Sequence, residues 1–423
     1  MMNNKIKLIK AREILDSRGN PTLETRIELE DGSVGVASVP SGASVGKYEA
    51  LELRDEDPHR YNGLGVLKAV NNVNNIIAPK LIGLQADHQL EVDRTLLSLD
   101  GTANKTKLGA NSLLSVSQGV CEAAAASEKV PNFEHVSHLY GLKKEKWLMP
   151  IPIFNLINGG KHGAGNLDFQ EFHLIPSPQK TYSDGLKVGE EIYQGVKKVL
   201  VRNGAIHSVG DEGGFAPDLF TNSDALEVLA QAVTESGYEL RKDVALGLDA
   251  AAGSFYKDGR YQIRDRSTPM DANELIEFYK DLINQYPLLS LEDPIFEDDW
   301  RGWQKVMKAL PGVLIVGDDL LATNKRRVEE AIKLQACSAI LVKPNQIGTI
   351  AETIEVIKIA RKANWKIIVS HRSGETEDDF IADFAVGVGA DYVKFGAPAR
   401  GERVAKYNRL LDIESQLSQP IPK

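Results

Sequence analysis

Short apolar runs recur through the second half of the chain, separated by amphipathic stretches long enough for a helix, such as 273–285 and 328–335. The clearest runs span 245–248, 288–291, 313–316, 339–342 and 367–369. Continuous apolar runs are typical of buried parallel strands. Repeated over about 275 residues, this alternation predicts a (β/α)8-type barrel, with an open doubly wound sheet as the alternative.

The first half of the chain has a different pattern. Residues 22–29 alternate between apolar and charged side chains, and Asp31-Gly32 then turns the chain into a second apolar stretch, 34–39. This pattern predicts an antiparallel hairpin. Helical patterns follow near 62–80, 88–99 and 108–127, so we expect a smaller α+β domain over 1–142 and the barrel over 143–423.

Composition excludes several classes of protein. The 423 residues carry a formal net charge of −9, which disfavours nucleic acid as a partner. Two cysteines cannot build a disulfide framework, and neither a signal-peptide core nor a run long enough to span a membrane occurs. We therefore expect a cytoplasmic protein without a membrane span.

An ionisable residue closes each of six predicted strands, at successive spacings of 43, 26, 25, 28 and 23 residues. These residues are Asp249, Glu292, Asp318, Lys343, His371 and Lys394. A single acid in this position often caps the next helix. Six in succession should instead meet at the end of the barrel where barrel enzymes hold their active sites.

Three carboxylates among these six residues need a cationic partner, because buried like charges repel each other. An all-oxygen ligand set suits Mg²⁺. Zinc is disfavoured because the chain has neither HExxH nor CxxC, and no complete nucleotide-binding glycine motif occurs.

Eight motifs in order along the chain together resemble the enolase family. They are SGASVG (41–46), NGGKHGAGN (158–166), QEF (170–172), GDEGGF (210–215), SLEDP (290–294), VGDDL (316–320), KPNQIGT (343–349) and SHRSGETED (370–378). The resemblance implies a Mg²⁺-dependent lyase that reversibly dehydrates 2-phospho-D-glycerate to phosphoenolpyruvate in glycolysis. It also implies a homo-oligomer, either a dimer or an octamer.

The resemblance further implies two Mg²⁺ ions per active site. By motif match, Asp249, Glu292 and Asp318 hold the first ion, and Ser44 contributes to the second. We expect Asp319, the rival ligand beside Asp318, to point away if the strand continues. The glycine-flanked loop around Ser44 would let the small domain act as a lid.

Catalytic roles follow from the same match. Lys343 matches the base, whose pKa must be depressed by metal charge and by Lys394. Glu212 matches the acid that protonates the departing hydroxyl, and like-charge repulsion from Glu171 should keep it protonated near neutral pH.

Substrate contacts are also implied by the match. Arg372 and Ser373 would clamp the phosphate, since guanidinium binds it bidentately, and Lys394 would contact the carboxylate. The complete expected set of substrate-binding residues is His162, Gln170, Glu171, Lys343, His371, Arg372, Ser373 and Lys394.

Two alternatives remain open at this point. One is a dehydratase of the same superfamily that acts on an unphosphorylated acid sugar, although Arg372, Ser373 and His162 would then have no phosphate to bind. The other is a non-catalytic binding protein with the same fold. Threonine is usual in the family at the positions of Val45 and Phe395, and we expect Phe395 to face the helix layer.

Overall fold

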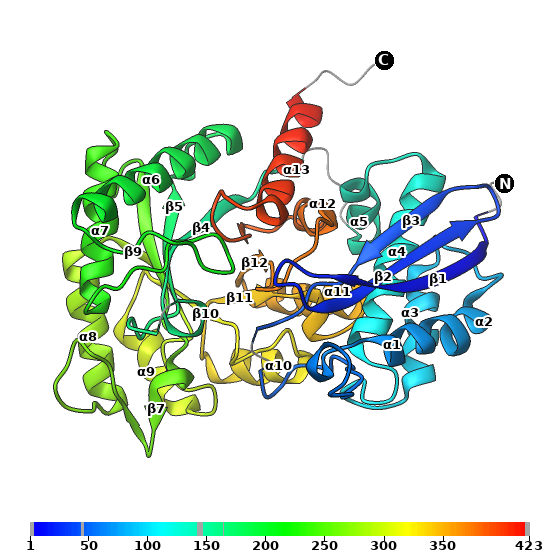
Figure 1. Cartoon of the computed structure of the whole chain (residues 1–423), viewed down its shortest axis with the longest axis horizontal. Helices are drawn as coiled ribbons and strands as arrows, with labels where there is room; N and C mark the ends of the chain where they lie inside the picture. Colours follow the sequence, from blue (N-terminus) through cyan, green and yellow to red (C-terminus); the bar gives the residue numbers. More distant parts are fainter. Residues whose placement is uncertain (1–3, 44–45, 142–146, 164, 419–423) are drawn as a thin grey trace.

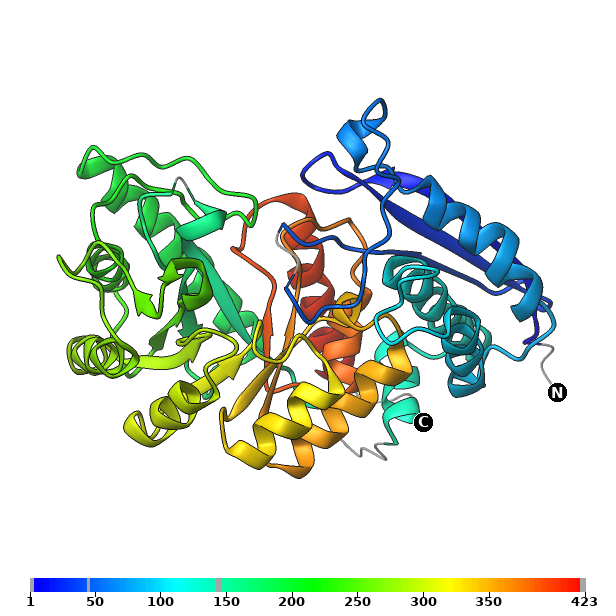
Figure 2. The same cartoon turned by 90° about the horizontal axis from the view of Figure 1, so that it is seen from below.

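The computed structural model describes residues 4–43, 46–141, 147–163 and 165–418. A closed eight-stranded barrel forms the larger part of the molecule, and a three-stranded sheet with its own helices lies beside it (Figures 1 and 2). The predicted fold class is therefore confirmed. The expected boundary at 142/143 lies outside the described residues and stays a prediction.

The barrel strands follow the order β10-β11-β12-β13-β4-β5-β6-β9 around the closed sheet. Their bounds are β4 (Ile151–Asn158), β5 (Glu171–Pro176), β6 (Val244–Asp249), β9 (Leu288–Glu292), β10 (Leu314–Gly317), β11 (Ala339–Val342), β12 (Lys366–Ser370) and β13 (Tyr392–Lys394). Five of these strands contain the apolar runs seen in the sequence.

One strand departs from a uniform (β/α)8 pattern. β5 runs antiparallel to both of its neighbours, β4 and β6. The described residues of the connection from β4 to β5, 159–163 and 165–170, form one short 3-10 turn, Gly160–His162, and a parallel return would need a longer crossover connection, usually through a helix. The reversal places the first residue of β5, Glu171, level with the last residue of β6, Asp249.

Helices follow most barrel strands and form the outer layer (Figure 1). Their bounds are α6 (Tyr182–Arg202), α7 (Asn222–Glu235), α8 (Ala272–Gln285), α9 (Trp300–Ala309), α10 (Lys325–Leu334), α11 (Ile350–Lys362), α12 (Phe380–Gly387) and α13 (Gly401–Ser418). Phe395 is fully buried and its ring lies 6.0 Å from that of Tyr407 on α13, so it faces the helix layer as expected.

The smaller domain is built on β1 (Ile6–Leu15), β2 (Pro21–Leu29) and β3 (Val34–Ser38), which pair antiparallel in that order. The predicted hairpin is β2–β3, whereas the sequence analysis missed β1. Its helices are α1 (Leu67–Asn71), α2 (Ala78–Leu81), α3 (Gln89–Asp100), α4 (Ala110–Glu128) and α5 (Asn132–Tyr140), with a π-helical segment, Asn72–Ile77, between α1 and α2.

Helix α4 packs closely against the sheet because small residues face each other. A Cβ on Gly35 would lie 2.1 Å from the carbonyl oxygen of Gly119, and Thr25 donates a hydrogen bond to Ser115 Oγ at 2.8 Å. No described helix combines the length and the hydropathy needed to cross a membrane.

Candidate active site

The C-terminal ends of the parallel strands surround a small, mostly polar cavity. Of the residues predicted for the site, those that line it are His162, Gln170, Glu171, Glu212, Asp249, Asp318, Lys343, His371, Arg372, Ser373 and Lys394. Glu292 lies just behind this lining, in contact with Lys394. Ser44 and Val45 lie outside the described residues. The structure thus brings together nearly all of the predicted set.

Strand register explains why the acidic residues meet. Asp249 pairs with Glu292 across β6 and β9, and with Glu171 across β6 and β5. These three carboxylates therefore lie at one level of the barrel. Each is at most 3% exposed, so their charges must be compensated within the protein.

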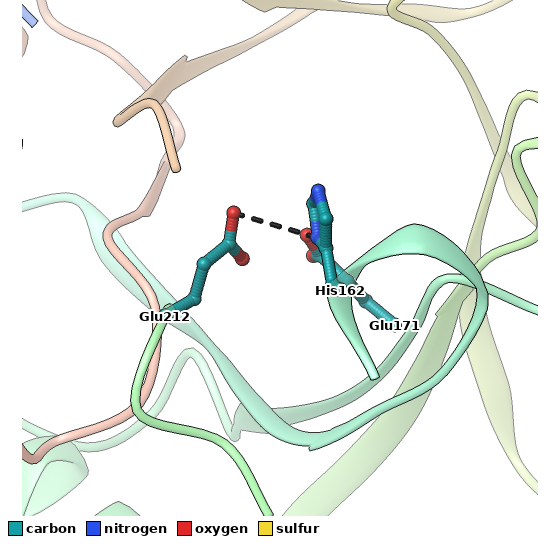
Figure 3. A group of neighbouring side chains, drawn as sticks. All are labelled: His162, Glu171 and Glu212. Carbon is teal, nitrogen blue, oxygen red and sulfur yellow. Dashed lines mark hydrogen bonds and ion pairs between the residues drawn. The ribbon is translucent and has the colours of Figure 1, made fainter. Parts of the chain in front are cut away.

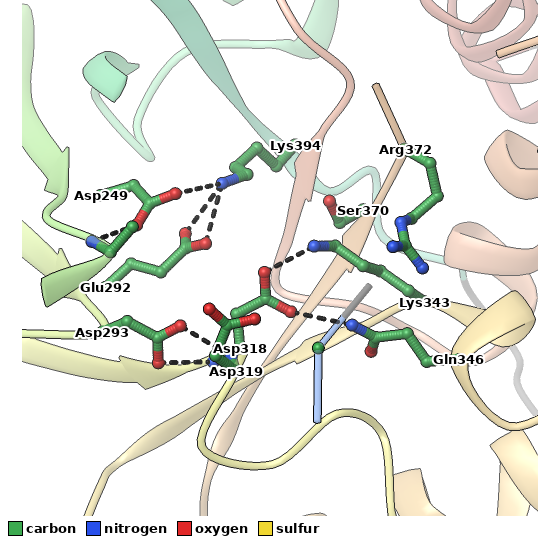
Figure 4. A network of polar contacts seen from close by, with 12 residues as sticks. Asp249, Glu292, Asp293, Asp318, Asp319, Lys343, Gln346, Ser370, Arg372 and Lys394 are labelled. Carbon is green, nitrogen blue, oxygen red and sulfur yellow. Dashed lines mark hydrogen bonds and ion pairs between the residues drawn. The ribbon is translucent and has the colours of Figure 1, made fainter. Parts of the chain in front are cut away.

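Lys394, at the end of β13, supplies much of this compensation (Figure 4). Its Nζ lies 2.9 Å from Glu292 Oε1, 2.9 Å from Glu171 Oε2 and 3.7 Å from Asp249 Oδ2. Burial disfavours the ammonium, but these carboxylates outweigh burial and hold the pKa of Lys394 well above its ordinary value. Lys394 is thus a fixed positive charge at the base of the cavity.

Lys343 forms a second ion pair, with its Nζ 2.5 Å from Asp318 Oδ2 (Figure 4). Its backbone is extended, with φ −129° and ψ 104°, as Pro344 requires. Burial lowers the pKa of Lys343, but Asp318 outweighs burial and raises it. Lys394 lowers the pKa of Lys343 as expected, but without bound metal the direct contact with Asp318 prevails, and the sequence could not show that contact.

Asp319 does not point away from the site. β10 ends at Gly317, so the alternation of a strand no longer applies, and Asp319 lines the cavity beside Asp318. The backbone amides of both residues donate to Asp293, at 3.1 and 2.7 Å (Figure 4). Burial and the charge of Asp318 raise the pKa of Asp319 to about 7.

Carboxylate and imidazole atoms gather within 4.8 Å of one another in two groups of three within the described part of the chain. One is Asp293, Asp318 and Asp319; the other is His162, Glu171 and Glu212. The predicted set Asp249, Glu292 and Asp318 is not among the groups found in those residues, and lysines lie against all three of its members. The acidic side of the cavity nevertheless offers the oxygen donors that a hard divalent cation binds.

His162 lies between two carboxylates (Figure 3). Its Nδ1 is 3.1 Å from Glu171 Oε1 and 3.5 Å from Glu212 Oε1. Burial opposes protonation, but the two carboxylates outweigh it and raise the pKa of His162 to about 9. Among His162, Glu171 and Glu212, it is therefore the imidazole of His162 that is protonated at neutral pH.

Glu212 does not keep its own proton in this structure. Burial and Glu171 both raise its pKa, yet His162 and His371 outweigh them and lower the pKa of Glu212 to about 2. Asn155 also donates to Glu212 Oε2 at 3.0 Å. The expected repulsion from Glu171 is present, but the sequence did not reveal that two histidines would flank the carboxylate.

The predicted phosphate-binding residues follow β12 and face the cavity. Ser373 Oγ lies 3.4 Å from His162 Nε2, which links the two predicted contacts. Gln170 donates to Asp249 Oδ2 at 3.0 Å. Arg372 contacts Glu49, a residue of the smaller domain that belongs to none of the sequence motifs.

Fold and site together define a barrel enzyme that performs acid–base chemistry on a small anionic substrate, since lysines, carboxylates and an arginine converge at the catalytic end of the barrel. Two family models match the chain: "Enolase, N-terminal domain" over residues 6–136, and "Enolase, C-terminal TIM barrel domain" over residues 146–421. A curated relative, Enolase 1 of Methylococcus capsulatus, is 46% identical over 420 residues, covering 99% of each chain. The chain belongs to the enolase family.

Proposed function

We propose that this chain catalyses the reversible dehydration of 2-phospho-D-glycerate to phosphoenolpyruvate. Family membership supports this lyase activity. The observation that carries it is the convergence of Lys343 and Glu212 on one cavity from parts of the barrel separated by β12 and β13. Dehydration of this substrate needs a base and an acid at two adjacent carbons.

Lys343 is the base in this proposal and removes the proton beside the substrate carboxylate. It must be neutral to do so, and its ion pair with Asp318 opposes that. Any cation that engages Asp318 would relieve this opposition and let burial lower the pKa of the amine.

Glu212 delivers the proton to the departing hydroxyl, and His162 and Glu171 take part in holding it. His162 Nδ1 lies 3.5 Å from Glu212 Oε1 and its pKa is raised to about 9, so Glu212 needs a higher pKa than in this structure to hold the proton that it delivers. Glu171, whose Oε1 lies 3.1 Å from His162 Nδ1, stabilises the protonated imidazole.

Substrate binding uses the cationic side of the cavity. Arg372, Ser373 and His162 bind the phosphate, and Lys394 contacts the carboxylate, with Gln170 and His371 as further contacts. The molecule as a whole is net negative, so these local charges are what attract a trianionic substrate.

The acidic side of the cavity fits Mg²⁺. The donors are carboxylate oxygens, and burial, followed by the charge of Asp249, holds the pKa of Glu292 well above its ordinary value in the absence of a cation. We assign Asp249, Glu292 and Asp318 to one ion and Ser44 to a second. When bound, the two ions supply positive charge that stabilises the dianionic intermediate.

Assembly and location are parts of the same proposal. We expect a dimeric or octameric homo-oligomer in the cytoplasm, with neither nucleic acid nor a membrane as partner. Light scattering after size-exclusion chromatography measures the assembly directly. The acid-sugar and non-catalytic alternatives are not favoured by the family matches.

Purified protein with 2-phosphoglycerate and Mg²⁺ tests the activity, because the enol product absorbs ultraviolet light and the substrate does not. We expect product with Mg²⁺, none after chelation, and recovery when Mg²⁺ is returned. Absence of product at saturating Mg²⁺ would support the non-catalytic alternative.

A further inference from the structure

Arg403, near the start of α13, carries a guanidinium group that is buried deep inside the molecule. Its side chain is 0% exposed. The nearest carboxylate oxygen, Glu402 Oε1, lies 3.5 Å from its Nε and is also held by Arg400 at 2.8 Å. Burying a charge with so little direct neutralisation costs free energy, which indicates that this guanidinium has a role beyond forming an ion pair.

The four side-chain hydrogen bonds that Arg403 makes to described residues go to the two loops that carry predicted active-site residues. Its Nη1 donates to His371 Nδ1 at 2.7 Å and to the carbonyl of Arg372 at 2.6 Å. Its Nη2 donates to the carbonyl of Asp211 at 3.1 Å and to that of Ser373. One group therefore ties the segment before Glu212 to the segment 371–373.

The contact with His371 fixes how that imidazole is protonated. Arginine can only donate hydrogen bonds, so His371 Nδ1 must be the acceptor, and in the neutral ring the proton must sit on Nε2. Nε2 is buried without a hydrogen-bond partner among the described residues, and it lies 3.5 Å from Glu212 Oε2. The N–H is thus directed at the proposed acid.

The charged groups around His371 favour the same state. Burial, opposed by Glu212 and Glu171 and reinforced by Arg403, lowers the pKa of His371. Glu375, whose pKa His371 helps to lower, is the other nearby acid, and Lys406 pairs with it at 3.0 Å. The ring therefore stays neutral while His162, on the other side of Glu212, is cationic.

We propose that Arg403 is a positioning residue that holds His371 as the neutral Nε2–H tautomer, so that it donates toward Glu212 and the substrate cavity. This inference rests on the proposed function for its catalytic meaning. The tautomer itself is a property of the resting protein. Arg403 acts through His371 and does not touch substrate.

Nitrogen NMR of full-length protein with ¹⁵N-labelled histidine tests this directly, because protonated and unprotonated ring nitrogens give separate signals. The chain has eight histidines, and His371→Gln assigns the signal of interest. We expect wild-type His371 to show unprotonated Nδ1 and protonated Nε2 without titrating from pH 6 to 8. A wild-type Nδ1–H tautomer, or an imidazolium, would overturn the proposal.

Arg403→Met should release the ring to a mixture of tautomers, shift the pH profile of kcat, and lower kcat by roughly 10–100-fold, as loss of a group that orients a histidine does elsewhere. Arg403→Lys keeps one donor and the charge. It should therefore retain part of the tautomer preference and part of the wild-type kcat. An unchanged His371 spectrum in Arg403→Met would overturn the proposal even if activity fell. If Arg403→Met does not fold, the wild-type spectrum and Arg403→Lys decide.

Arg400→Met is the matched control. Arg400 precedes α13 and donates to the carbonyl of Gly210, in the segment before Glu212, and to that of Ser17 in the smaller domain, but no hydrogen bond joins it to His371 in the described part of the chain. Its loss should leave the tautomer unchanged. Wild-type protein with the expected tautomer but no dehydration of 2-phosphoglycerate would refute the proposed function and leave this inference standing.

Discussion

The carboxylate of Glu49 forms a two-point ion pair with the guanidinium of Arg372, with Nη1–Oε2 at 2.8 Å and Nη2–Oε1 at 3.2 Å. Glu49 belongs to the smaller domain, and Arg372 follows a barrel strand. The pair fills the bidentate position on Arg372 that we propose for the substrate phosphate. In the proposed binding mode, phosphate would therefore have to displace the Glu49 carboxylate from Arg372.

Glu49→Gln should tighten the binding of inorganic phosphate by about tenfold, because it removes a competing charge while keeping the shape of the side chain. Isothermal titration calorimetry measures the Kd. Glu56→Gln is the control. It removes an exposed charge from the same stretch of chain between β3 and α1 and should change the Kd for phosphate little. Unchanged or weaker phosphate binding in Glu49→Gln would show that the pair does not compete with the ligand.

Lys343→Met should lower exchange of the substrate α-proton with solvent by about 10²–10⁴-fold, since a positioned general base contributes that much. Proton NMR in deuterated buffer follows the exchange without requiring dehydration. Lys325→Met, which removes a surface lysine paired with Glu355, serves as the control. Exchange that persists in Lys343→Met would assign the base to another group.

His162 should stabilise the fold in a pH-dependent way. Its pKa is raised to about 9, so the stabilisation is fully present below pH 6.5 and is lost as the pH rises through 9. Thermal unfolding of wild type and His162→Gln should differ most at pH 6, by roughly 1–3 kcal/mol, and converge above pH 9. A difference that is constant with pH would mean that the imidazole is not charged in the folded state.

Gly189 on α6 should not tolerate a larger residue. A Cβ there would lie 2.2 Å from Phe154 Cε2, so Gly189→Ala should destabilise the protein by about 1–3 kcal/mol through overpacking. Gly185, one turn earlier on the same helix, would meet nothing closer than 3.5 Å. Gly185→Ala should therefore stabilise by up to about 1 kcal/mol, and chemical denaturation measures both variants.

Much of this site could be predicted because six of the eight barrel strands end in, or directly before, a residue of the site. The apolar runs mark the strands, and residues such as Asp249 and Lys394 directly close them. Parallel packing then brings these ends together whatever the rest of the chain does. The order of residues along the chain is sufficient for this part of the prediction.

Other features depend on distances that no local pattern encodes. The protonation of Glu212 depends on two histidines from separate segments, and the pKa of Lys343 on one oxygen 2.5 Å away. Glu49 and Arg403 belong to no motif, and ERVAK on a charged helix gives no sign that its arginine is buried. The missed strand β1 mixes lysines and arginine with its apolar residues, so its alternation is weak.

The reversed direction of β5 also affects how the molecule could be altered. Its connection from β4 carries His162 and Gln170 to the catalytic end, so the segment that leaves β5 for α6, residues 177–181, emerges at the far end of the barrel. A fluorescent domain or affinity tag inserted there would lie at the end of the barrel opposite the candidate active site. The same insertion between β4 and β5 would interrupt the histidine–carboxylate group itself.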